Sequence, residues 1–244
     1  MNIQFFTPSY KRAKTTEIDQ YLKNVHFCVH DFEAEEYKKY HDNVIVMPDE
    51  LRWNMARVRN FILDYARRNW IDVCVMLDDD VEYIGYFEEQ ELYKITEGEL
   101  VDKIFEWSHM AEDFGTVLFW LNLQSDPKFY REYSPFSLLS PVLWPFMCIL
   151  TKGNFLRFDE RLGLNEDYDF SLQVLQKHHK IFRNNKFHYR CGHLTDKGGC
   201  GAYRVLDEEK RQAEVMIRKW GSKVVSYDFE KSTNPRINCP LKGI

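Results

Sequence analysis

Three aspartates follow directly on an apolar run. Residues 73–77 read Val-Cys-Val-Met-Leu, and Asp78, Asp79 and Asp80 come next. Adjacent carboxylates repel one another, and burying them without a partner costs folding free energy. Ligands of open α/β sheets bind at the carboxyl ends of the strands. The segment therefore predicts a divalent cation that holds a phosphorylated ligand, and the alternative is a solvated acidic turn after a core strand.

A second acidic group lies at residues 165–170, which read Asn-Glu-Asp-Tyr-Asp-Phe. The helix dipole favours carboxylates in the first turn of a helix, so capping accounts for part of this charge. Three carboxylates within four residues exceed what capping requires. Asp167 or Glu166, held in a cleft, could act as a general base toward an acceptor hydroxyl group.

A histidine with an informative context is His193, which precedes the glycine-rich stretch 197–201. An imidazole next to a flexible loop suits a metal ligand beside a closing lid, and the alternative is a surface histidine. Another reading is a zinc cluster, but its spacing matches no standard structural zinc site. The residues of that cluster would be His188, Cys191, His193 and Cys200.

The charge of the chain limits its partners. It has 244 residues and a net charge of −5, which argues against a dominant nucleic-acid electrostatic footprint. Basic residues still gather locally, so one basic face is possible, and the alternative is ordinary solvated surface. These local groups are Lys11, Arg12 and Lys14; Arg52, Arg57 and Arg59; residues 177–180; and Arg183, Lys186 and Arg190.

Membrane and export signals are not found in the sequence. No apolar run approaches the roughly 20 residues that span a bilayer. Residues 1–10 lack the basic and long apolar regions of a signal peptide. We therefore expect no membrane partner and a reducing, cytoplasmic location. Free cysteines behave as small hydrophobes there, as expected for Cys28, Cys74 and Cys148 in their apolar runs.

Hydrophobic periodicity predicts alternating strands and helices, which favours a mostly parallel sheet. Residues 180–190 predict a hairpin that turns at Asn184-Asn185. Residues 122–145 read as an irregular segment, and a segment of that length is usually functional. The predicted strands are 2–7, 25–30, 43–47, 73–77, 116–121 and 146–151, and the predicted helices are 31–40, 53–69, 99–114, 165–178 and 206–220.

Taken in chain order, these segments resemble the GT-A fold of nucleotide-sugar glycosyltransferases. Asp78–Asp80 match the DxD element of that fold, Glu166-Asp167 match its ED element, and His193 matches its third metal ligand. The resemblance covers roughly residues 1–205 and rests on several motifs in the right order. The remaining motifs are Thr7-Pro8-Ser9-Tyr10, Ala56-Arg57-Val58-Arg59-Asn60 and Phe158-Asp159-Glu160.

The resemblance implies an α/β protein with a single GT-A, Rossmann-like domain over residues 1–228. A central mixed, mostly parallel sheet flanked by helices would form that domain, and residues 229–244 would form a C-terminal tail. Within the fold, segment 193–200 looks most similar to the TET/JBP-associated glycosyltransferases of bacteriophages. That family is associated with glycosylation of 5-hydroxymethylcytosine in DNA, so a phage-encoded chain would act in the host cytoplasm.

The same resemblance implies roles for individual residues. The donor would be a UDP-sugar, the cofactor Mn²⁺ or Mg²⁺, and the metal ligands Asp80 and His193. Asp167, with Glu166 as the second carboxylate, would deprotonate the acceptor for an in-line attack that inverts the anomeric centre. The donor-binding residues would be Thr7, Pro8 and Tyr10 at the nucleoside, Arg12 at the phosphates, Asp78 and Asp79 at the ribose or uracil, Lys197 and Arg204 in the closing loop, and Arg57, Arg59 or Asn60 beside the donor or the aspartates.

The acceptor is the least constrained part of this interpretation. A hydroxymethyl group on a stacked base is hard to reach, so a DNA acceptor implies an extruded base or a single strand. Aromatic residues of the irregular segment could stack on bases or simply pack the loop. They are Phe129, Tyr130, Tyr133, Phe136 and Trp144. The alternatives are transfer of the sugar to a glycan or protein, and a non-catalytic module that binds nucleotides or nucleic acid.

Overall fold

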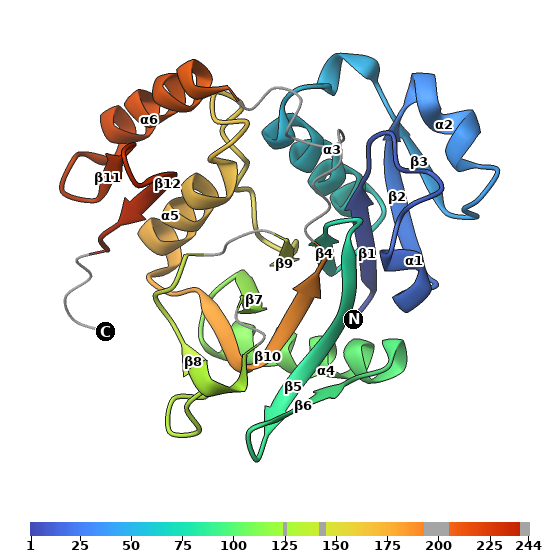
Figure 1. Ribbon diagram of the computed structural model, residues 1–244, viewed down its shortest axis with the longest axis horizontal. Helices are drawn as coiled ribbons and strands as arrows, with labels where there is room; N and C mark the ends of the chain where they lie inside the picture. The colour runs from blue at the N-terminus through green and yellow to red at the C-terminus, as the bar shows by residue number, and fades with distance from the viewer. Residues whose placement is uncertain (124–125, 142–144, 193–204, 240–244) are drawn as a thin grey trace.

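The computed structural model describes residues 1–123, 126–141, 145–192 and 205–239. In those ranges a ten-stranded sheet forms the centre of the molecule, with helices packed on both of its faces (Figure 1). One hydrophobic cluster lies between the sheet and the side chains of α1, α2 and α4, and a second lies between the sheet and α3 and α5. The helices are α1 (Ile18–Tyr21), α2 (Asp31–Tyr37), α3 (Met55–Arg68), α4 (Glu97–Asp113), α5 (Glu166–His178) and α6 (Leu206–Trp220).

The strands of the main sheet are β1 (Ile3–Pro8), β2 (Val25–His30), β3 (Val44–Met47), β4 (Val73–Leu77), β5 (Val81–Glu88), β6 (Glu91–Lys94), β7 (Leu118–Asn122), β8 (Phe136–Ser137), β9 (Phe146–Leu150) and β10 (Phe182–Cys191). Their order is β3-β2-β1-β4-β9-β7-β10-β5-β6, and β8 pairs with β10. The pairings give β5, β8 and β9 one direction and the other strands the opposite one. The predicted α/β fold with a mixed, mostly parallel sheet is confirmed.

The first four strands bring three chain segments to one edge of the sheet. Strand β1 pairs in parallel with both β2 and β4, and every residue of β4 is buried. The segments that leave β1, β2 and β4 at their carboxyl ends therefore meet there. They begin at Ser9, Asp31 and Asp78. The fold thus places the aspartate triplet at the edge where the sequence pattern predicts a ligand.

Helix α3 begins and packs as its sequence predicts. The Asn54 side chain accepts a hydrogen bond from the Arg57 backbone N–H at 3.1 Å, which caps the first turn. Its apolar face, with Val58, Ile62 and Leu63, lies in the cluster shared with α5. Two polar residues, Arg59 and Asn60, are buried on the same helix, which the amphipathic pattern does not explain.

Residues 180–190 do not form the predicted hairpin, so that prediction is wrong. They belong to the single strand β10, which pairs in parallel with β7 through its first half and antiparallel with β5 through its second half. The Asn184 side chain accepts hydrogen bonds from the backbone N–H groups of Lys186 and Phe187, at 3.1 and 3.4 Å. These bonds stabilise an irregularity in the strand instead of a chain reversal.

Strands β5 and β6 form a hairpin that the sequence pattern did not indicate. Gly85 is required in it, because a Cβ atom there would lie 2.6 Å from the Tyr93 carbonyl oxygen and 3.2 Å from the His188 ring. The His188 ring also stacks on Phe87, with 4.3 Å between centroids. His188 is fully buried, and neither ring nitrogen has a hydrogen-bond partner among the residues that the structure describes. Burial lowers the pKa of His188 to about 4.

The C-terminal part of the described chain adds a small separate sheet. Strand β11 (Val225–Asp228) pairs antiparallel with β12 (Ser232–Ile237), so β12 lies in the segment predicted as a tail. The predicted irregular segment contains the short strand β8 and a 3₁₀ turn, Pro127–Phe129, among its described residues. No helix within the described ranges is long and apolar enough to cross a bilayer.

Candidate active site

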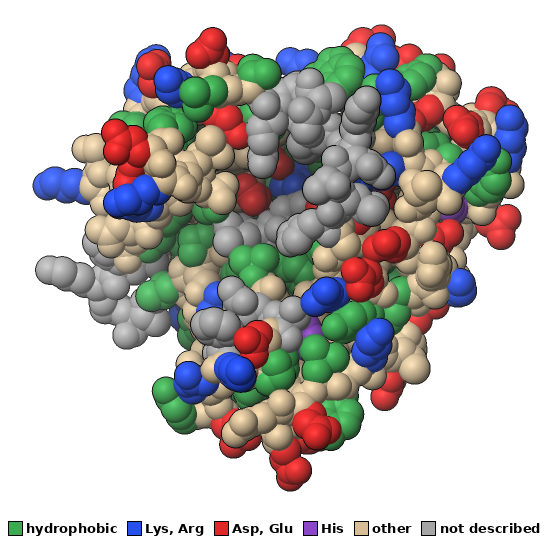
Figure 2. Space-filling model, viewed as in Figure 1, with side chains coloured by type: hydrophobic (Ala, Val, Ile, Leu, Met, Phe, Trp, Pro, Cys, Tyr) green, Lys and Arg blue, Asp and Glu red, His purple; other side chains and the backbone are tan. Residues whose placement is uncertain are grey.

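The aspartate triplet sits in a tight turn after β4. The Asp78 backbone N–H donates to the Pro145 carbonyl at 3.1 Å, and the Val81 N–H reaches back to the Asp78 carbonyl at 3.4 Å. This turn starts β5 immediately, so the triplet joins two strands of the same sheet. Figure 2 shows acidic and basic side chains at the bottom of a hollow in this face of the molecule.

Asp79 is held entirely by the protein. Its carboxylate accepts a hydrogen bond from Ser9 Oγ at 2.5 Å and pairs with Arg12 Nη1 at 2.6 Å, and the residue is 4% exposed. The Tyr37 hydroxyl lies 2.6 Å from Ser9 Oγ and accepts from the Arg12 backbone N–H at 3.0 Å. The Asp79 carbonyl also accepts the backbone N–H group of Glu17 at 3.0 Å. Asp79 therefore anchors the segment after β1 to the triplet.

Asp78 and Asp80 differ from Asp79 because their environment disfavours the charged form. Burial, followed by repulsion from Asp80, raises the pKa of Asp78 well above its usual range, and Arg59 opposes that shift. Burial and the charge of Asp79 raise the pKa of Asp80 to about 6. The Asp80 Oδ1 atom is buried and has no hydrogen-bond partner among the described residues. These two carboxylates have the character of ligands that a cation would stabilise.

The end of β10 lies against the same turn. The Gly192 backbone N–H donates to the Asp80 carbonyl oxygen at 3.0 Å. A Cβ atom at Gly192 would lie 2.8 Å from Glu17 Oε2, so a larger residue there would displace the Glu17 carboxylate. Burial, and next the charge of Asp80, raise the pKa of the Cys191 thiol. Cys191 and Gly192, at the end of β10, are therefore close to the triplet.

The second acidic motif begins helix α5, and a buried arginine connects it to the triplet. Arg59 Nη1 lies 2.8 Å from Glu166 Oε1, with 2% and 6% of the two side chains exposed. The Arg59 guanidinium also lies 5.7 Å from the Phe158 ring centroid. Because the charge of Arg59 also acts on Asp78, one cation interacts with both motifs.

Asp167 follows at the start of the helix and is 9% exposed. Its Oδ1 accepts the Tyr168 backbone N–H at 2.8 Å. The Tyr189 hydroxyl is buried, has no hydrogen-bond partner within the described ranges, and lies near both motifs. Burial raises its pKa well above the usual range, and the charges of Asp78 and Asp167 act in the same direction. The structure thus brings Asp78, Asp167 and Tyr189 into one neighbourhood.

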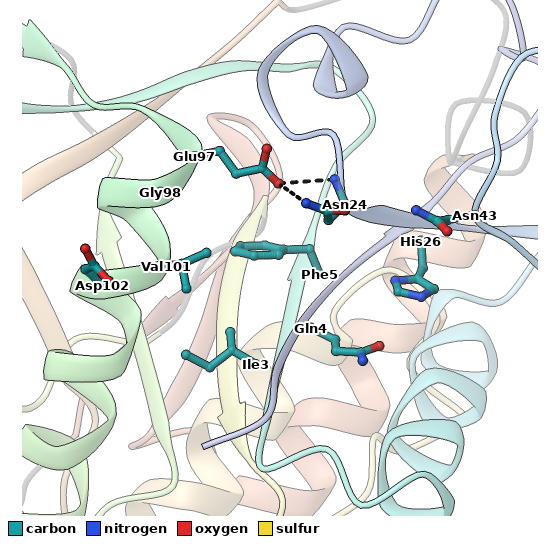
Figure 3. Close-up of a pocket in the computed structure, with 10 residues that line it drawn as sticks. All are labelled: Ile3, Gln4, Phe5, Asn24, His26, Asn43, Glu97, Gly98, Val101 and Asp102. Carbon is teal, nitrogen blue, oxygen red and sulfur yellow. Dashed lines mark hydrogen bonds between the residues drawn. The ribbon is translucent and has the colours of Figure 1, made fainter.

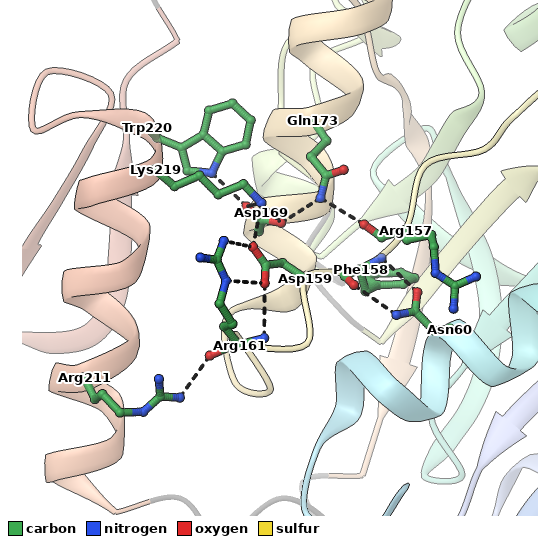
Figure 4. Close-up of polar contacts among 10 residues, drawn as sticks. All are labelled: Asn60, Arg157, Phe158, Asp159, Arg161, Asp169, Gln173, Arg211, Lys219 and Trp220. Atoms are coloured by element: carbon green, nitrogen blue, oxygen red, sulfur yellow. Dashed lines mark hydrogen bonds and ion pairs between the residues drawn. The ribbon is translucent and has the colours of Figure 1, made fainter.

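Asp169, the last carboxylate of the motif, points away from this neighbourhood into a structural network (Figure 4). It is fully buried and accepts the Trp220 indole N–H at 2.8 Å, a Lys219 ammonium hydrogen at 2.9 Å and the Gln173 amide at 2.7 Å. Lys219 also pairs with Asp159 at 2.9 Å. This network attaches α6 to α5 and thereby fixes the helix that carries Asp167.

The basic and amide residues of α3 also have protein partners. Asn60 is buried, and its amide donates to the Phe158 carbonyl at 3.0 Å while its oxygen accepts the Phe158 N–H at 2.9 Å. Arg57 is half exposed and pairs with Glu160 at 3.4 Å. These contacts fix residues 158–160, the segment before the second motif. Binding of the donor by Arg57 or Asn60 stays a prediction.

The residues predicted at the nucleoside lie at the end of β1. Thr7 is fully buried, and its hydroxyl has no hydrogen-bond partner in the described parts of the chain. Pro8 ends the strand, and the Tyr10 ring packs against Trp53, with 5.5 Å between centroids. Thr7, Pro8 and Tyr10 therefore lie on the same edge as the triplet. His193 and Lys197, together with Arg204 and Trp144, lie outside the described residues.

The remaining predicted aromatic residues lie away from the triplet. Tyr130 stacks on Phe87 with 5.8 Å between centroids, and Phe136 meets the edge of Phe182 at 5.4 Å. Tyr133 is 86% exposed. The side chain of Phe129 lies outside the part of the chain that the structure describes. Of these aromatic residues, Tyr130 and Phe136 therefore pack against other rings of the protein, and Tyr133 is exposed to solvent.

Several contributors to the site escaped the sequence analysis. Ser9 belongs to the motif Thr7-Pro8-Ser9-Tyr10, but no role was predicted for it. Tyr37 was not singled out, because it lies at the end of a charged helix. Arg59 was named only as one of three possible contacts. Tyr189 was read as part of a hairpin strand. Among the described residues no group of three His, Cys, Asp or Glu side chains could hold a metal ion. The predicted second ligand, His193, lies outside those residues, so the pairing of Asp80 with His193 stays a prediction.

A large cavity of about 700 Å³ lies elsewhere, at the amino ends of the parallel strands (Figure 3). Its lining includes Gln4, His26 and Asn43 from the start of the sheet, and Glu97 from the start of α4. The Glu97 carboxylate is bonded to the backbone and side-chain amides of Asn24, at 3.1 and 3.2 Å. Because the acidic motifs lie at the opposite strand ends, this cavity is separate from the candidate active site.

Comparison with known proteins shows which family the chain belongs to. Solved structures similar to this chain include the following two. One is S. aureus TarS 1-349 in complex with UDP, at 13% identity, TM-score 0.46, and coverage of 90% of this chain and 72% of that one. The other is A197 from STIV, at 14% identity, TM-score 0.43, and coverage of 79% and 86%. No curated protein matches the chain. Residues 3–199 match the TET-Associated Glycosyltransferase family, and the chain belongs to that family of glycosyltransferases.

Proposed function

We propose that this glycosyltransferase uses a divalent cation to transfer a sugar from a UDP-sugar to a hydroxyl group. The proposed acceptor is 5-hydroxymethylcytosine in phage DNA. The observation that carries the proposal is the position of Arg59, which pairs with Glu166 and acts electrostatically on Asp78. This position supports one site that contains both acidic motifs. A donor-binding motif and a base-bearing motif must meet in this way if one active site is to transfer a group.

The donor is proposed to lie along the edge formed by β1 and β4. Thr7, Pro8 and Tyr10 would line the nucleoside, and Arg12 would face the phosphates. The Asp79 carboxylate orients Arg12 through an ion pair. Asp79 would therefore contribute to donor binding in two ways, by its own position at this edge and by holding Arg12 in place. Asp78 would contact the ribose. Arg57, Asn60 and Lys197 complete the proposed donor contacts.

Residues suited to hold a divalent cation are present at this edge. Asp80 has a buried oxygen without a partner in the described part of the chain, and burial, followed by repulsion from Asp79, disfavours its charge. Gly192, the residue before His193, bonds to the Asp80 backbone, which supports His193 as the second ligand. Bound Mn²⁺ or Mg²⁺ would neutralise the charge that develops on the departing diphosphate.

Asp167 is proposed to act as the general base. It would accept the proton of the acceptor hydroxyl while that oxygen bonds to the anomeric carbon, and the bond from that carbon to the diphosphate would break with its electrons leaving on the diphosphate. Glu166 is paired with Arg59, so it would orient the start of α5. A single displacement inverts the anomeric centre. NMR of the product tests this, because an α-linked product from an α-linked donor would contradict it.

Mass spectrometry can test donor and acceptor together. Hydroxymethylated DNA would be incubated with the protein, Mn²⁺ and a panel of nucleotide sugars, then digested to nucleosides. We expect a hexose or N-acetylhexosamine mass on 5-hydroxymethyl-2′-deoxycytidine only with a UDP-sugar. Ordinary cytosine DNA is the matched control. Transfer to a glycan or protein but not to this DNA would overturn the proposed acceptor and keep the proposed chemistry.

A further inference from the structure

An aromatic cluster lies just beyond the carboxyl ends of β1 and β2. The Tyr10 ring is at its centre, with centroids 6.4 Å from His30, 6.1 Å from Phe32 and 5.5 Å from Trp53. His30 and Phe32 stack on each other at 6.3 Å. We call Phe32 and Trp53 the outer rings. They come from separate segments, one at the start of α2 and one before α3, so the fold assembles the cluster.

Both outer rings are large hydrophobic side chains that are only half buried, which the hydrophobic effect does not favour. Phe32 is 48% exposed and Trp53 is 50% exposed. Trp53 also adopts a left-handed backbone conformation with φ at 64°, which is costly for a bulky residue. An exposed ring on strained backbone at the rim of an active site is typical of a ligand contact.

The charges beside the outer rings suit an anionic aromatic ligand. The Arg52 guanidinium lies 4.9 Å from the Phe32 centroid, and the Lys11 ammonium lies 5.1 Å from the Tyr10 centroid. Two carboxylates beside these rings are engaged with backbone, since Asp49 accepts the Phe32 N–H at 3.4 Å and Glu33 accepts the Lys11 N–H at 2.8 Å. Beside Phe32 a hollow of about 500 Å³ is lined by Lys11, Arg12 and Lys14 together with Glu33 and Glu36.

We propose that Phe32 and Trp53 stack unpaired bases of the acceptor DNA strand that flank the modified nucleotide, with Lys11 and Arg52 facing its phosphates. This inference rests on the proposed DNA acceptor. Every base presents a π face, so such a surface binds single strands with little sequence preference. The donor nucleoside is assigned to Thr7, Pro8 and Tyr10, which leaves the outer rings for a second aromatic ligand. An extruded target base also leaves unpaired neighbours that need a surface.

Fluorescence anisotropy with a short labelled single strand of ordinary deoxynucleotides tests the surface apart from catalysis. We expect Trp53→Ala and Phe32→Ala each to weaken binding about tenfold, as stacking on one base is worth roughly that much. Trp53→Phe keeps a ring and should retain most of the affinity. Trp70→Ala is the matched control, because Trp70 is 86% exposed, follows the other end of α3 and also has a positive φ of 55°.

The outcomes separate this surface from the proposed function. If the wild-type protein binds the strand and both alanine variants bind like Trp70→Ala, the stacking surface is wrong and the DNA acceptor stands. If UDP with Mn²⁺ displaces the strand completely, the outer rings belong to the donor site and the inference fails. If the wild-type protein binds no strand yet transfers sugar to another hydroxyl compound, the DNA acceptor fails as well.

Discussion

Arg59 Nη1 and Glu166 Oε1 lie 2.8 Å apart, and both side chains are almost fully enclosed. The pair joins α3 to the first turn of α5 across 107 positions of sequence (166 − 59). Removing one partner of a buried ion pair leaves an uncompensated charge, whereas removing both does not. This relationship holds the second acidic motif against the first.

Breaking that pair should therefore be costly. We expect Arg59→Met and Glu166→Leu each to lower the free energy of unfolding by about 3 to 5 kcal/mol, and the double variant to lose less than the sum. Urea denaturation in metal-free buffer measures this. Arg57→Met is the control, because Arg57 pairs with Glu160 on the half-exposed surface and should cost under about 1 kcal/mol. Additive losses in the double variant would show that the pair is not coupled.

The three aspartates should respond differently to substitution. Asp79→Ala strands the Arg12 guanidinium and Ser9, so we expect a loss of about 3 kcal/mol in unfolding free energy. Asp80→Asn removes one of three crowded carboxylates and should change stability by less than about 1 kcal/mol while sugar transfer is lost. Denaturation in EDTA and a transfer assay measure the two effects. Equal destabilisation by both variants would contradict the division of roles.

His188 should make the fold sensitive to acid. Its pKa is lowered to about 4 in the folded protein from a usual value of 6.5, because burial disfavours the imidazolium. Below pH 6.5 the unfolded chain takes up a proton that the folded protein refuses, so this residue reduces stability progressively as the pH falls toward 4. His188→Phe keeps a flat ring against Gly85 and Phe87 and removes this effect.

We therefore expect the stability difference between His188→Phe and the wild-type protein to grow by on the order of 2 kcal/mol between pH 7 and pH 4. Denaturation curves across that range measure it. A constant difference between His188→Phe and the wild-type protein would mean that His188 has a hydrogen-bond partner in solution.

The sequence predicted the parallel half of the sheet because each strand there is a short apolar run with a clear end. Strands β2 and β4 have the predicted bounds, and α6 ends before Gly221 as predicted. The β10 prediction failed because two consecutive asparagines signal a turn, whereas Asn184 bonds to the next two backbone N–H groups inside the strand. Strand β5 was not predicted, because its hydrophobic residues follow directly on Asp80 and no turn residue separates them from the acidic triplet.

The candidate site was predictable where its residues are neighbours in sequence. Asp78–Asp80 and Glu166-Asp167 stand out as local groups of carboxylates. Their partners were not predictable, since Arg59 and Tyr189 reach the site only when α3, α5 and β10 pack together. The division of roles within the triplet likewise depends on Ser9 and Arg12.

The central claim is that the two acidic motifs form one active site with Asp167 as its base. Turnover of Asp167→Asn at saturating donor and acceptor, together with calorimetric binding of UDP and Mn²⁺, tests it most directly, with exposed Asp113→Asn as the control. We predict a loss of about 10²- to 10⁴-fold in turnover with donor affinity unchanged. Wild-type turnover in Asp167→Asn, with donor binding intact, would contradict the account.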